Sequence, residues 1–312
     1  MKENSELGIE DRGVGIELTQ HASTRAPHHE ADASKGLSRI DRLWPRSQPL
    51  VMGILNCTPD SFADGGRCFD FDDALRHADT LIEGGADIID VGGESTRPGA
   101  DSVDLAEETR RVMPVVTEIR RRWPEIVLSV DTSKVAVAEA ALASGADLVN
   151  DVTAASADGM LELVARSGAG IVFMHMRGEP RTMQSDTTYD NVVAEVHELL
   201  RSRAAAAIAA GIPAHRVWLD PGIGFGKDDD GNLALLAALP DLAAGGHPVL
   251  IGPSNKSFIG RLTGAEVDDR LPGTLAALLP AVGIDRAVVR VHDASATVQF
   301  LEIASRLHEA SV

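Results

Sequence analysis

Five polar side chains lie at or just after the ends of short apolar runs, where they could form the floor of a binding site. They are Asp90, Asp131, Asn150, Asp220 and Lys256. Together they offer several hydrogen-bond acceptors beside one cationic donor. This combination suits a flat heterocycle with ring N–H and amino donors on one edge and a carbonyl on another. One aspartate after a strand usually caps the next helix, as Asp131 could, but five such groups favour a binding site.

A second set of side chains combines amide, hydroxyl, imidazole and guanidinium groups and is typical of an anion site. Its members are Asn56, Thr96, Arg97, Ser254, Arg290 and His292. Such donors suit a phosphate or pyrophosphate, and the amide oxygen of Asn56 could hold a divalent cation beside it. For either arginine taken alone, a surface ion pair is the more ordinary explanation.

A glycine-rich stretch, residues 222–227, invites comparison with phosphate-binding loops. It does not match the Walker pattern, because Pro221 stands at the first glycine position and Asp228 replaces the Ser/Thr after Lys227. Lys227 also occupies the third glycine position of the dinucleotide pattern, which excludes that motif. We interpret the stretch as a tight turn that brings backbone close to a ligand and places Phe225 against it.

Two long polar loops, residues 58–66 and 92–99, follow the first two apolar runs. Glycines at their ends predict mobile loops that cover a site, with plain surface loops as the alternative. The sequence Met174-His175-Met176 could suggest metal ligation, but methionines beside a strand end are more typical of a pocket wall.

Eight short apolar runs alternate with stretches of helical periodicity after Pro49. The runs cover residues 51–55, 88–91, 127–130, 148–150, 170–174, 217–219, 249–251 and 287–291. The helical stretches include residues 72–83, 105–122, 134–143, 191–210, 268–282 and 294–307. Strands that are apolar throughout indicate a parallel sheet buried on both faces, and this alternation predicts an α/β fold, the (β/α)8 barrel. A doubly wound open sheet is the alternative, but only a barrel brings all the strand ends to one mouth.

Composition and charge narrow the class of protein. The 312 residues contain 29 Lys+Arg against 47 Asp+Glu, a formal charge of -18, which argues against a nucleic acid or a membrane as partner. Cys57 and Cys68 form no CxxC pattern, and no apolar run reaches membrane-spanning length, so we expect a cytoplasmic protein. Residues 1–48 lack apolar periodicity and are predicted to be a disordered tail, which leaves residues 49–312 for the barrel.

Several longer motifs are distributed along the predicted barrel. They are Met52-Gly53-Ile54-Leu55-Asn56, Thr58-Pro59-Asp60-Ser61-Phe62, residues 87–99 (DIIDVGGESTRPG), Ser129-Val130-Asp131-Thr132, Asn150-Asp151-Val152, residues 220–227 (DPGIGFGK) and Arg290-Val291-His292-Asp293. In type and order they resemble the dihydropteroate synthase family, over about residues 51–307. The resemblance implies a homodimeric transferase of folate biosynthesis with a (β/α)8 fold. Its small-molecule substrates would be 6-hydroxymethyl-7,8-dihydropterin pyrophosphate and 4-aminobenzoate, and its products 7,8-dihydropteroate and pyrophosphate.

The resemblance also implies roles for individual residues. The pterin would be bound by Asp90, Asp131, Asn150, Met174, Asp220, Phe225 and Lys256. The pyrophosphate would be bound by Asn56, Thr96, Arg97, Ser254, Arg290 and His292, with Mg²⁺ at Asn56. The aminobenzoate would be bound by Phe62, Thr96, Pro98 and Ser257. Asn56, Lys256 and Arg290 would act in catalysis.

One position departs from the family pattern. The family usually has Ser-Arg-Lys where this chain has Ser254-Asn255-Lys256, and Asn255 has neither the charge nor the reach of arginine. Cys57 also replaces a usual aliphatic residue. Two alternatives to an active synthase stay open: a paralogue that binds pterin pyrophosphate without condensing it, and a pterin-dependent methyltransferase. The methyltransferase is disfavoured because it has no use for the predicted anion site.

Overall fold

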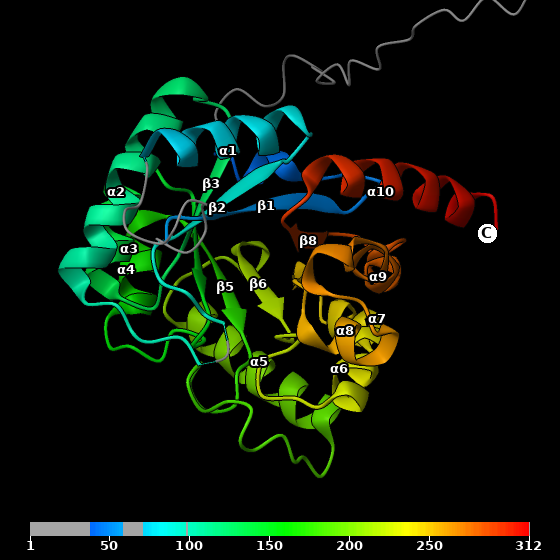
Figure 1. Ribbon diagram of the computed structural model, residues 1–312. Coiled ribbons are helices and arrows are strands. Elements are labelled where there is room, and N and C mark those ends of the chain that lie inside the picture. The colour runs from blue at the N-terminus through cyan, green and yellow to red at the C-terminus, as the bar shows by residue number, and fades with distance from the viewer. Residues whose placement is uncertain (1–37, 59–70, 98, 312) are drawn as a thin grey trace, which may run out of the picture. The chain divides into compact units, whose positions relative to one another are not determined.

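The predicted strands form one closed parallel barrel in which strand order follows chain order (Figure 1). The computed structural model describes residues 38–58, 71–97 and 99–311. The strands are β1 (Leu50–Asn56), β2 (Ile88–Gly92), β3 (Val127–Asp131), β4 (Leu148–Asp151), β5 (Gly170–Met174), β6 (Val217–Asp220), β7 (Val249–Ile251) and β8 (Ala287–Val291). In β1, Met52 lies opposite both Ile88 and Arg290, which closes the barrel. The (β/α)8 prediction is therefore confirmed, and the open sheet is excluded.

Helices surround the barrel on its outside (Figure 1). They are α1 (Phe71–Glu83), α2 (Leu105–Arg122), α3 (Val135–Ala143), α4 (Met160–Ser167), α5 (Val192–Ala209), α6 (Asp229–Ala237), α7 (Leu239–Ala243), α8 (Ser257–Thr263), α9 (Leu271–Ala277) and α10 (Ala294–Glu309). Several begin at a side chain that accepts a hydrogen bond from a free N–H of the first turn, as Asp104 does from Glu107 and Asp293 from Ala296. Within the described residues, no helix has the length and apolar character needed to cross a bilayer.

The single helix predicted over residues 268–282 is wrong. The structure has three short elements there: η4 (Val267–Asp269), α9 and η5 (Leu279–Ala281). Pro272 and Pro280 lie in the first turns of α9 and η5. Proline has no N–H to donate within a helix but suits a first turn, so each proline starts a new element. The other predicted helical stretches agree closely with α1, α2, α3, α5 and α10.

Apolar side chains pack in two layers separated by the barrel wall. Leu50, Met52 and Trp218 belong to the layer inside the barrel, whereas Val51 and Leu55 belong to the layer between the strands and the helices. The alternation arises because successive side chains of a strand point to opposite faces. Every second strand residue therefore faces the barrel interior, and this periodicity decides which side chains can reach its mouth.

The segment before β1 packs against the amino ends of the strands. Ile40 and Leu43 are 3% and 9% exposed and belong to the inner apolar layer. The Trp44 ring meets the Trp218 ring edge-on, with the two centroids 6.4 Å apart. These apolar residues span only the one-turn helix η1 (Asp41–Leu43) and its flanks, which is too short for a periodicity signal. The predicted disordered tail therefore does not extend to residue 48, and its residues 1–37 lie outside the described residues.

Candidate active site

Strand periodicity aims most of the predicted floor residues into the mouth of the barrel. In β2, Ile88 faces the interior and Ile89 faces the helices, so Asp90 faces the interior again. By the same count, inward-facing positions at or near the carboxyl ends of their strands are held by Asp131, Asn150, Met174, Asp220 and Arg290. Because all strands are parallel, these ends meet on one side of the barrel.

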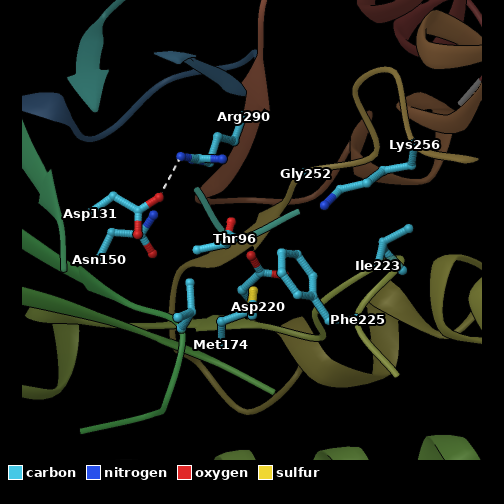
Figure 2. A pocket seen from close by; sticks show the side chains of 11 residues that line it. Thr96, Asp131, Asn150, Met174, Asp220, Ile223, Phe225, Gly252, Lys256 and Arg290 are labelled. Carbon is cyan, nitrogen blue, oxygen red and sulfur yellow. Dashed lines mark hydrogen bonds and ion pairs between the residues drawn. The ribbon is translucent and has the colours of Figure 1, made fainter. Parts of the chain in front are cut away.

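A cavity of about 340 Å³, part of it open to solvent, lies at this mouth. Its lining consists of Thr96, Asp131, Asn150, Val152, Met174, Asp220, Ile223, Phe225, Gly252, Lys256 and Arg290. Lys256 and Asp131 point into it from opposite sides (Figure 2). Sequence reasoning predicted eight of the lining residues but not Val152, Ile223 or Gly252.

Asp90 lies beneath this cavity and is not part of its lining. Its residue exposure is 0%, and its Oδ2 accepts hydrogen bonds from Arg290 Nε at 2.7 Å and Asn150 Nδ2 at 3.0 Å. Its Oδ1 has no hydrogen-bond partner among the described residues. Asp90 thus orients two residues that do line the cavity, and its own contact with a ligand stays a prediction.

Arg290 joins two carboxylates that come from different strands. Besides its bond to Asp90, its Nη2 donates to Asp131 Oδ2 at 2.8 Å. Burial lowers the pKa of Arg290, but the charges of Asp90 and Asp131 outweigh burial and raise it above its ordinary value. The arginine is therefore charged, and the ion pairs offset the cost of burying all three groups.

The carboxyl groups of the floor have raised pKa values. Burial raises the pKa of Asp131 to about 7, although the charge of Arg290 opposes the rise. Burial likewise raises the pKa of Asp220 to about 6, opposed by the N–H of Gly222, which donates to its Oδ1 at 2.7 Å. Near neutral pH, a ligand that donates hydrogen bonds would favour the ionised form of both groups.

Lys256 and Phe225 form the wall opposite Asp131. The ammonium of Lys256 lies 3.8 Å from the centroid of the Phe225 ring, within the range of a cation–π interaction. Burial lowers the pKa of Lys256 to about 8, and Arg290 adds to this effect. Phe225 packs with Met174 and Val152 in a small apolar cluster. The cavity therefore combines an apolar wall, two cations and a polar floor.

Lys227 holds the glycine-rich turn in place, a role that sequence reasoning missed. It is 1% exposed, and its Nζ donates to the carbonyls of Phe225 at 2.8 Å, Gly222 at 2.9 Å and His175 at 3.2 Å. Burial lowers its pKa to about 7, opposed by the charge of Asp220. The sequence predicts a tight turn that places Phe225, but it gives no sign that the lysine within this turn holds it. The structure makes it an internal tie that places Phe225.

Ser254 and His292 form a fixed part of the predicted anion site. Ser254 Oγ lies 2.9 Å from His292 Nδ1 and accepts from the His292 backbone N–H at 3.2 Å. Burial lowers the pKa of His292 to about 4, and Arg290 and Arg97 add to this effect. The imidazole is therefore neutral at pH 7. If Ser254 donates to Nδ1, the Nε2–H is left as a donor for an anion.

The remaining predicted residues are less constrained by side-chain contacts. Asn56 is half-buried at the end of β1, and no hydrogen bond to its side chain occurs among the described residues. Arg97 is exposed, and its charge lowers the pKa of Lys256, which places it near the cavity. Ser257 is exposed and accepts from Arg261 at 2.9 Å. Phe62 and Pro98 lie outside the described residues.

Asn255 has the backbone conformation that asparagine tolerates best among residues with a side chain. Its φ is 57°, in the left-handed region. Its N–H donates to Thr274 Oγ1 at 3.0 Å, and its carbonyl accepts from Arg270 Nη1 at 3.1 Å. The departure from the family pattern therefore suits the local backbone.

Comparison with known proteins agrees with this geometry. A family model described as "Pterin binding enzyme" matches residues 52–292, from β1 to just past β8. The chain belongs to this pterin-binding family.

Among its pterin-binding relatives, the dihydropteroate synthase of Escherichia coli (strain K12) is 45% identical over 257 residues, which cover 82% of this chain and 91% of that protein. The Xanthomonas albilineans dihydropteroate synthase solved with 4-aminobenzoic acid has a TM-score of 0.78 at 46% identity, covering 84% of this chain and 93% of that chain. The same enzyme in complex with 7,8-dihydropteroate gives a TM-score of 0.75 at 43% identity, covering 84% and 94%. The predicted resemblance to dihydropteroate synthases is confirmed.

Proposed function

We propose that this pterin-binding enzyme is a dihydropteroate synthase, which condenses 6-hydroxymethyl-7,8-dihydropterin pyrophosphate with 4-aminobenzoate. The observation that carries the proposal is the single cavity in which Asp131, Asn150 and Asp220 face Lys256 and adjoin Arg290. One site thus contains both the acceptors that a pterin needs and the cation that its pyrophosphate needs. Relatives with that name, one solved with 4-aminobenzoic acid and one with 7,8-dihydropteroate, support the proposal.

The floor recognises the pterin through its hydrogen-bonding edge. Ring N–H and amino groups of the heterocycle donate to carboxylate and amide oxygens of Asp131, Asn150 and Asp220, and its carbonyl accepts from Lys256. Met174 and Phe225 contact the faces of the ring. Burial raises the pKa values of Asp131 and Asp220 in the ligand-free site, and the donors of a bound ring would favour the ionised form of both groups.

Bond breaking begins with departure of the pyrophosphate. The C–O bond between the pterin methylene and the pyrophosphate breaks, and both electrons go to oxygen. Arg290 and His292 stabilise the charge on the leaving pyrophosphate, while the pterin ring and the floor carboxylates stabilise the positive charge on the methylene carbon. Water must be kept from this carbon until the amine arrives.

A Mg²⁺ ion, when bound, would neutralise further charge on the leaving pyrophosphate. Among the described residues no group of three or more His, Cys, Asp or Glu side chains could hold such an ion. Mg²⁺ often binds through few protein oxygens together with water and substrate phosphates. The amide oxygen of Asn56, which accepts no hydrogen bond from the described residues, fits this mode. We therefore assign Asn56 as its protein ligand, with the pyrophosphate as the other partner.

The second substrate completes the reaction by forming the new C–N bond. The lone pair of the aniline nitrogen attacks the methylene carbon, and the nitrogen then loses one proton to solvent. This nitrogen is neutral at pH 7, so no strong general base is needed. Thr96 and Ser257, at the mouth, would contact the aminobenzoate, as would Phe62 and Pro98.

We further infer that the enzyme acts as a homodimer in the cytoplasm. An apolar groove between η5 and α10 supports self-association, because its lining residues Leu279, Ile303 and Leu307 are 54%, 57% and 66% exposed. Light scattering during size-exclusion chromatography should give twice the chain mass. An Ile303→Asp variant that remains dimeric would exclude this groove as the interface.

A paralogue that binds pterin pyrophosphate without condensing it is the second candidate, and Asn255 is the observation that favours it. Replacing Asn255 with Arg restores the family charge at a backbone φ that arginine tolerates poorly. A clear gain in turnover would identify Asn255 as the limiting residue. Unchanged rate and affinities would show that the departure does not limit function.

Release of pyrophosphate tests the proposed function. The purified protein is supplied with Mg²⁺ and the pterin pyrophosphate, with and without 4-aminobenzoate, and 7,8-dihydropteroate is measured in parallel. We expect release that depends on aminobenzoate and equals product formation. Binding of the pterin substrate without release would favour the paralogue, and absence of binding would overturn the site.

A further inference from the structure

Three charged side chains connect the segment after β2 to the strand that carries Asp131. Lys134 Nζ donates to a carboxylate oxygen of Glu94 and to one of Glu108. The other oxygen of Glu108 accepts from Thr132 Oγ1 at 2.6 Å. The side chain of Glu108 is 1% exposed, whereas those of Glu94 and Lys134 are 24% and 27% exposed. One buried carboxylate thus anchors a chain of contacts that runs outward to the mouth.

The Glu108 end of this chain belongs to the rigid part of the site. Thr132 follows Asp131 directly, and its backbone N–H donates to the carbonyl of Asn150 at 3.1 Å. The Lys134 N–H donates to Thr132 Oγ1, also at 3.1 Å. Glu108 itself comes from α2, so it ties that helix to the ends of β3 and β4. Its position is therefore fixed relative to the pterin floor.

The Glu94 end belongs to the segment that reaches the cavity. A Cβ at Gly93 would lie 2.7 Å from Val112 Cγ2, so glycine is needed for this close approach to α2. The Gly93 carbonyl accepts from Arg111 Nη1 at 2.9 Å. Glu94 follows, and two residues later Thr96 lines the cavity. The pair of Glu94 with Lys134 is thus the side-chain ion pair nearest to Thr96 along the described part of this segment.

We propose that Lys134 is a positioning residue for the second substrate. By holding Glu94 against the Glu108–Thr132 pair, it sets where Thr96 and Arg97 stand relative to the floor. This inference rests on the proposed function, because the aminobenzoate is the substrate that Thr96 would meet. Lys134 does not line the cavity, and its link to the segment that carries Thr96 is the contact with Glu94.

The geometry gives two separate reasons for a lysine at this position. The buried carboxylate of Glu108 requires a cationic partner, and an unpaired charge there would be costly. The ammonium has a further N–H available, and this one reaches Glu94. Removing Glu94 keeps the pair of Lys134 with Glu108 and ends the pair of Lys134 with Glu94. Glu94→Ala is therefore the cleanest variant, because it frees the segment without stranding a buried charge.

The expected result is a loss specific to the second substrate. Glu94→Ala and Lys134→Met should each raise KM for 4-aminobenzoate about tenfold, because small misplacements of positioning groups are costly. In Glu94→Ala the Kd of the pterin pyrophosphate should stay within about twofold of the wild-type value, since this variant keeps the pair of Lys134 with Glu108 and leaves the floor untouched. Lys134→Arg, which keeps the charge, should recover most of the loss.

Two controls separate positioning from folding. Arg166→Met removes the exposed ion pair with Glu139 on the neighbouring helices α3 and α4, and it should leave both constants unchanged. The double variant Glu108→Gln with Lys134→Met has no stranded charge but still lacks the anchor for Glu94, so its KM should stay high. A wild-type KM in the double variant would show that Lys134 only neutralises Glu108.

Hydrogen exchange tests the anchor without any assay of turnover. Backbone amides of residues 93–97 should exchange faster in ligand-free Glu94→Ala than in wild type or Arg166→Met. Equal exchange together with a wild-type KM would overturn the proposal. If Glu94→Ala exchanges faster but the wild-type protein shows no synthase activity, the anchoring role of Lys134 stands and the proposed function is refuted.

Discussion

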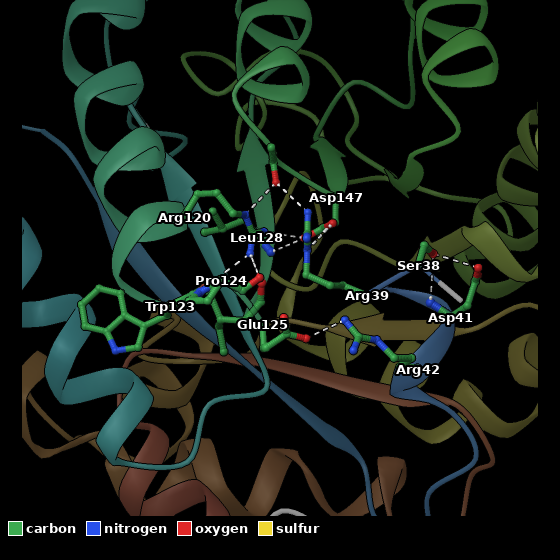
Figure 3. A network of polar contacts seen from close by, with 12 residues as sticks. Ser38, Arg39, Asp41, Arg42, Arg120, Trp123, Pro124, Glu125, Leu128 and Asp147 are labelled. Atoms are coloured by element: carbon green, nitrogen blue, oxygen red, sulfur yellow. Dashed lines mark hydrogen bonds and ion pairs between the residues drawn. The ribbon is translucent and has the colours of Figure 1, made fainter. Parts of the chain in front are cut away.

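Both ends of the barrel place arginine beside aspartate, but among the described residues only the aspartate at the amino end has hydrogen-bond partners for both of its oxygens. There, Asp147 lies between two arginines that come from the segment before β1 and from α2 (Figure 3). It accepts from Arg39 Nε at 2.9 Å, from Arg120 Nη2 at 2.8 Å and from the Leu128 N–H at 3.0 Å. This arrangement ties the segment before β1 and helix α2 to the amino ends of β3 and β4, and it leaves little for a ligand to add.

At the carboxyl end, one arginine pairs with two carboxylates. Arg290 serves both Asp90 and Asp131, while Asp220 receives one backbone N–H within the described residues. One oxygen of Asp90 has no partner there, and burial holds the pKa of Asp131 at about 7. The difference teaches that the amino end is built for stability and the carboxyl end for a ligand that supplies the missing donors.

The largest expected effect is on pterin binding at the carboxyl end. Asp220→Ala should weaken binding of the pterin pyrophosphate by about 2–4 kcal/mol, because ring donors would be left unpaired in a buried pocket. Isothermal titration calorimetry measures this change, with Asp147→Ala as the matched loss of an aspartate. Unaltered affinity in Asp220→Ala would remove Asp220 from the floor.

At the amino end, Asp147→Ala should lower the free energy of unfolding by about 2 kcal/mol, since two partly buried arginines lose their carboxylate. Urea denaturation followed by circular dichroism measures the loss. Pterin affinity should not change. A variant as stable as wild type would mean that the two arginines find solvent or backbone partners of equal worth.

The raised pKa of Asp131 predicts that the free energy of unfolding of the ligand-free protein depends on pH. A carboxyl group with a folded-state pKa of about 7 binds more protons in the folded than in the unfolded state between about pH 4 and 7. Its contribution to stability is therefore complete below pH 4 and is lost as the pH rises through 7. The stability of ligand-free Asp131→Asn relative to wild type should rise by about 2 kcal/mol between pH 5 and pH 8.

Urea denaturation of wild type and Asp131→Asn at both pH values measures this change. Comparing the two proteins at each pH cancels the titration of other groups. A difference that does not vary with pH would mean that Asp131 is already ionised at pH 5 in the folded protein.

The smallest effect concerns the exposed side of the mouth. Arg97→Ala should lower kcat/KM about tenfold, the value of one charge-assisted contact, while largely sparing pterin affinity. Steady-state kinetics and calorimetry on the same preparation measure both quantities. An equal loss of pterin binding would place Arg97 with the floor and weaken the division between floor and mouth.

Much of the site can be predicted from the sequence because two regular features of the barrel act together. Alternation along a strand and the common direction of parallel strands place Asp131, Asn150 and Asp220 in one cavity. Each of them ends a run that is recognisable as a strand. For the same reason the barrel itself was predictable, whereas the end of the tail and the stretch over residues 268–282 depended on short-range details.

What the sequence did not reveal depends on distances between side chains. Asp90 faces the barrel interior like Asp131, but it pairs with Ser129, one inward-facing position deeper, and it is covered by Arg290. Lys227 and Glu108 act through buried contacts with carbonyls and with another element, and no local pattern marks them. Such roles arise only once the packing of the helices on the barrel is known.

A crystal structure of this enzyme with the pterin pyrophosphate bound tests the central claim most directly. We predict that the heterocycle lies between Met174 and Phe225, with its donors within hydrogen-bond distance of Asp220 and Asn150 and its carbonyl near Lys256. The pyrophosphate should then lie against Arg290 and His292. A heterocycle bound outside this cavity, or one that leaves Asp220 without a ligand contact, would contradict the account.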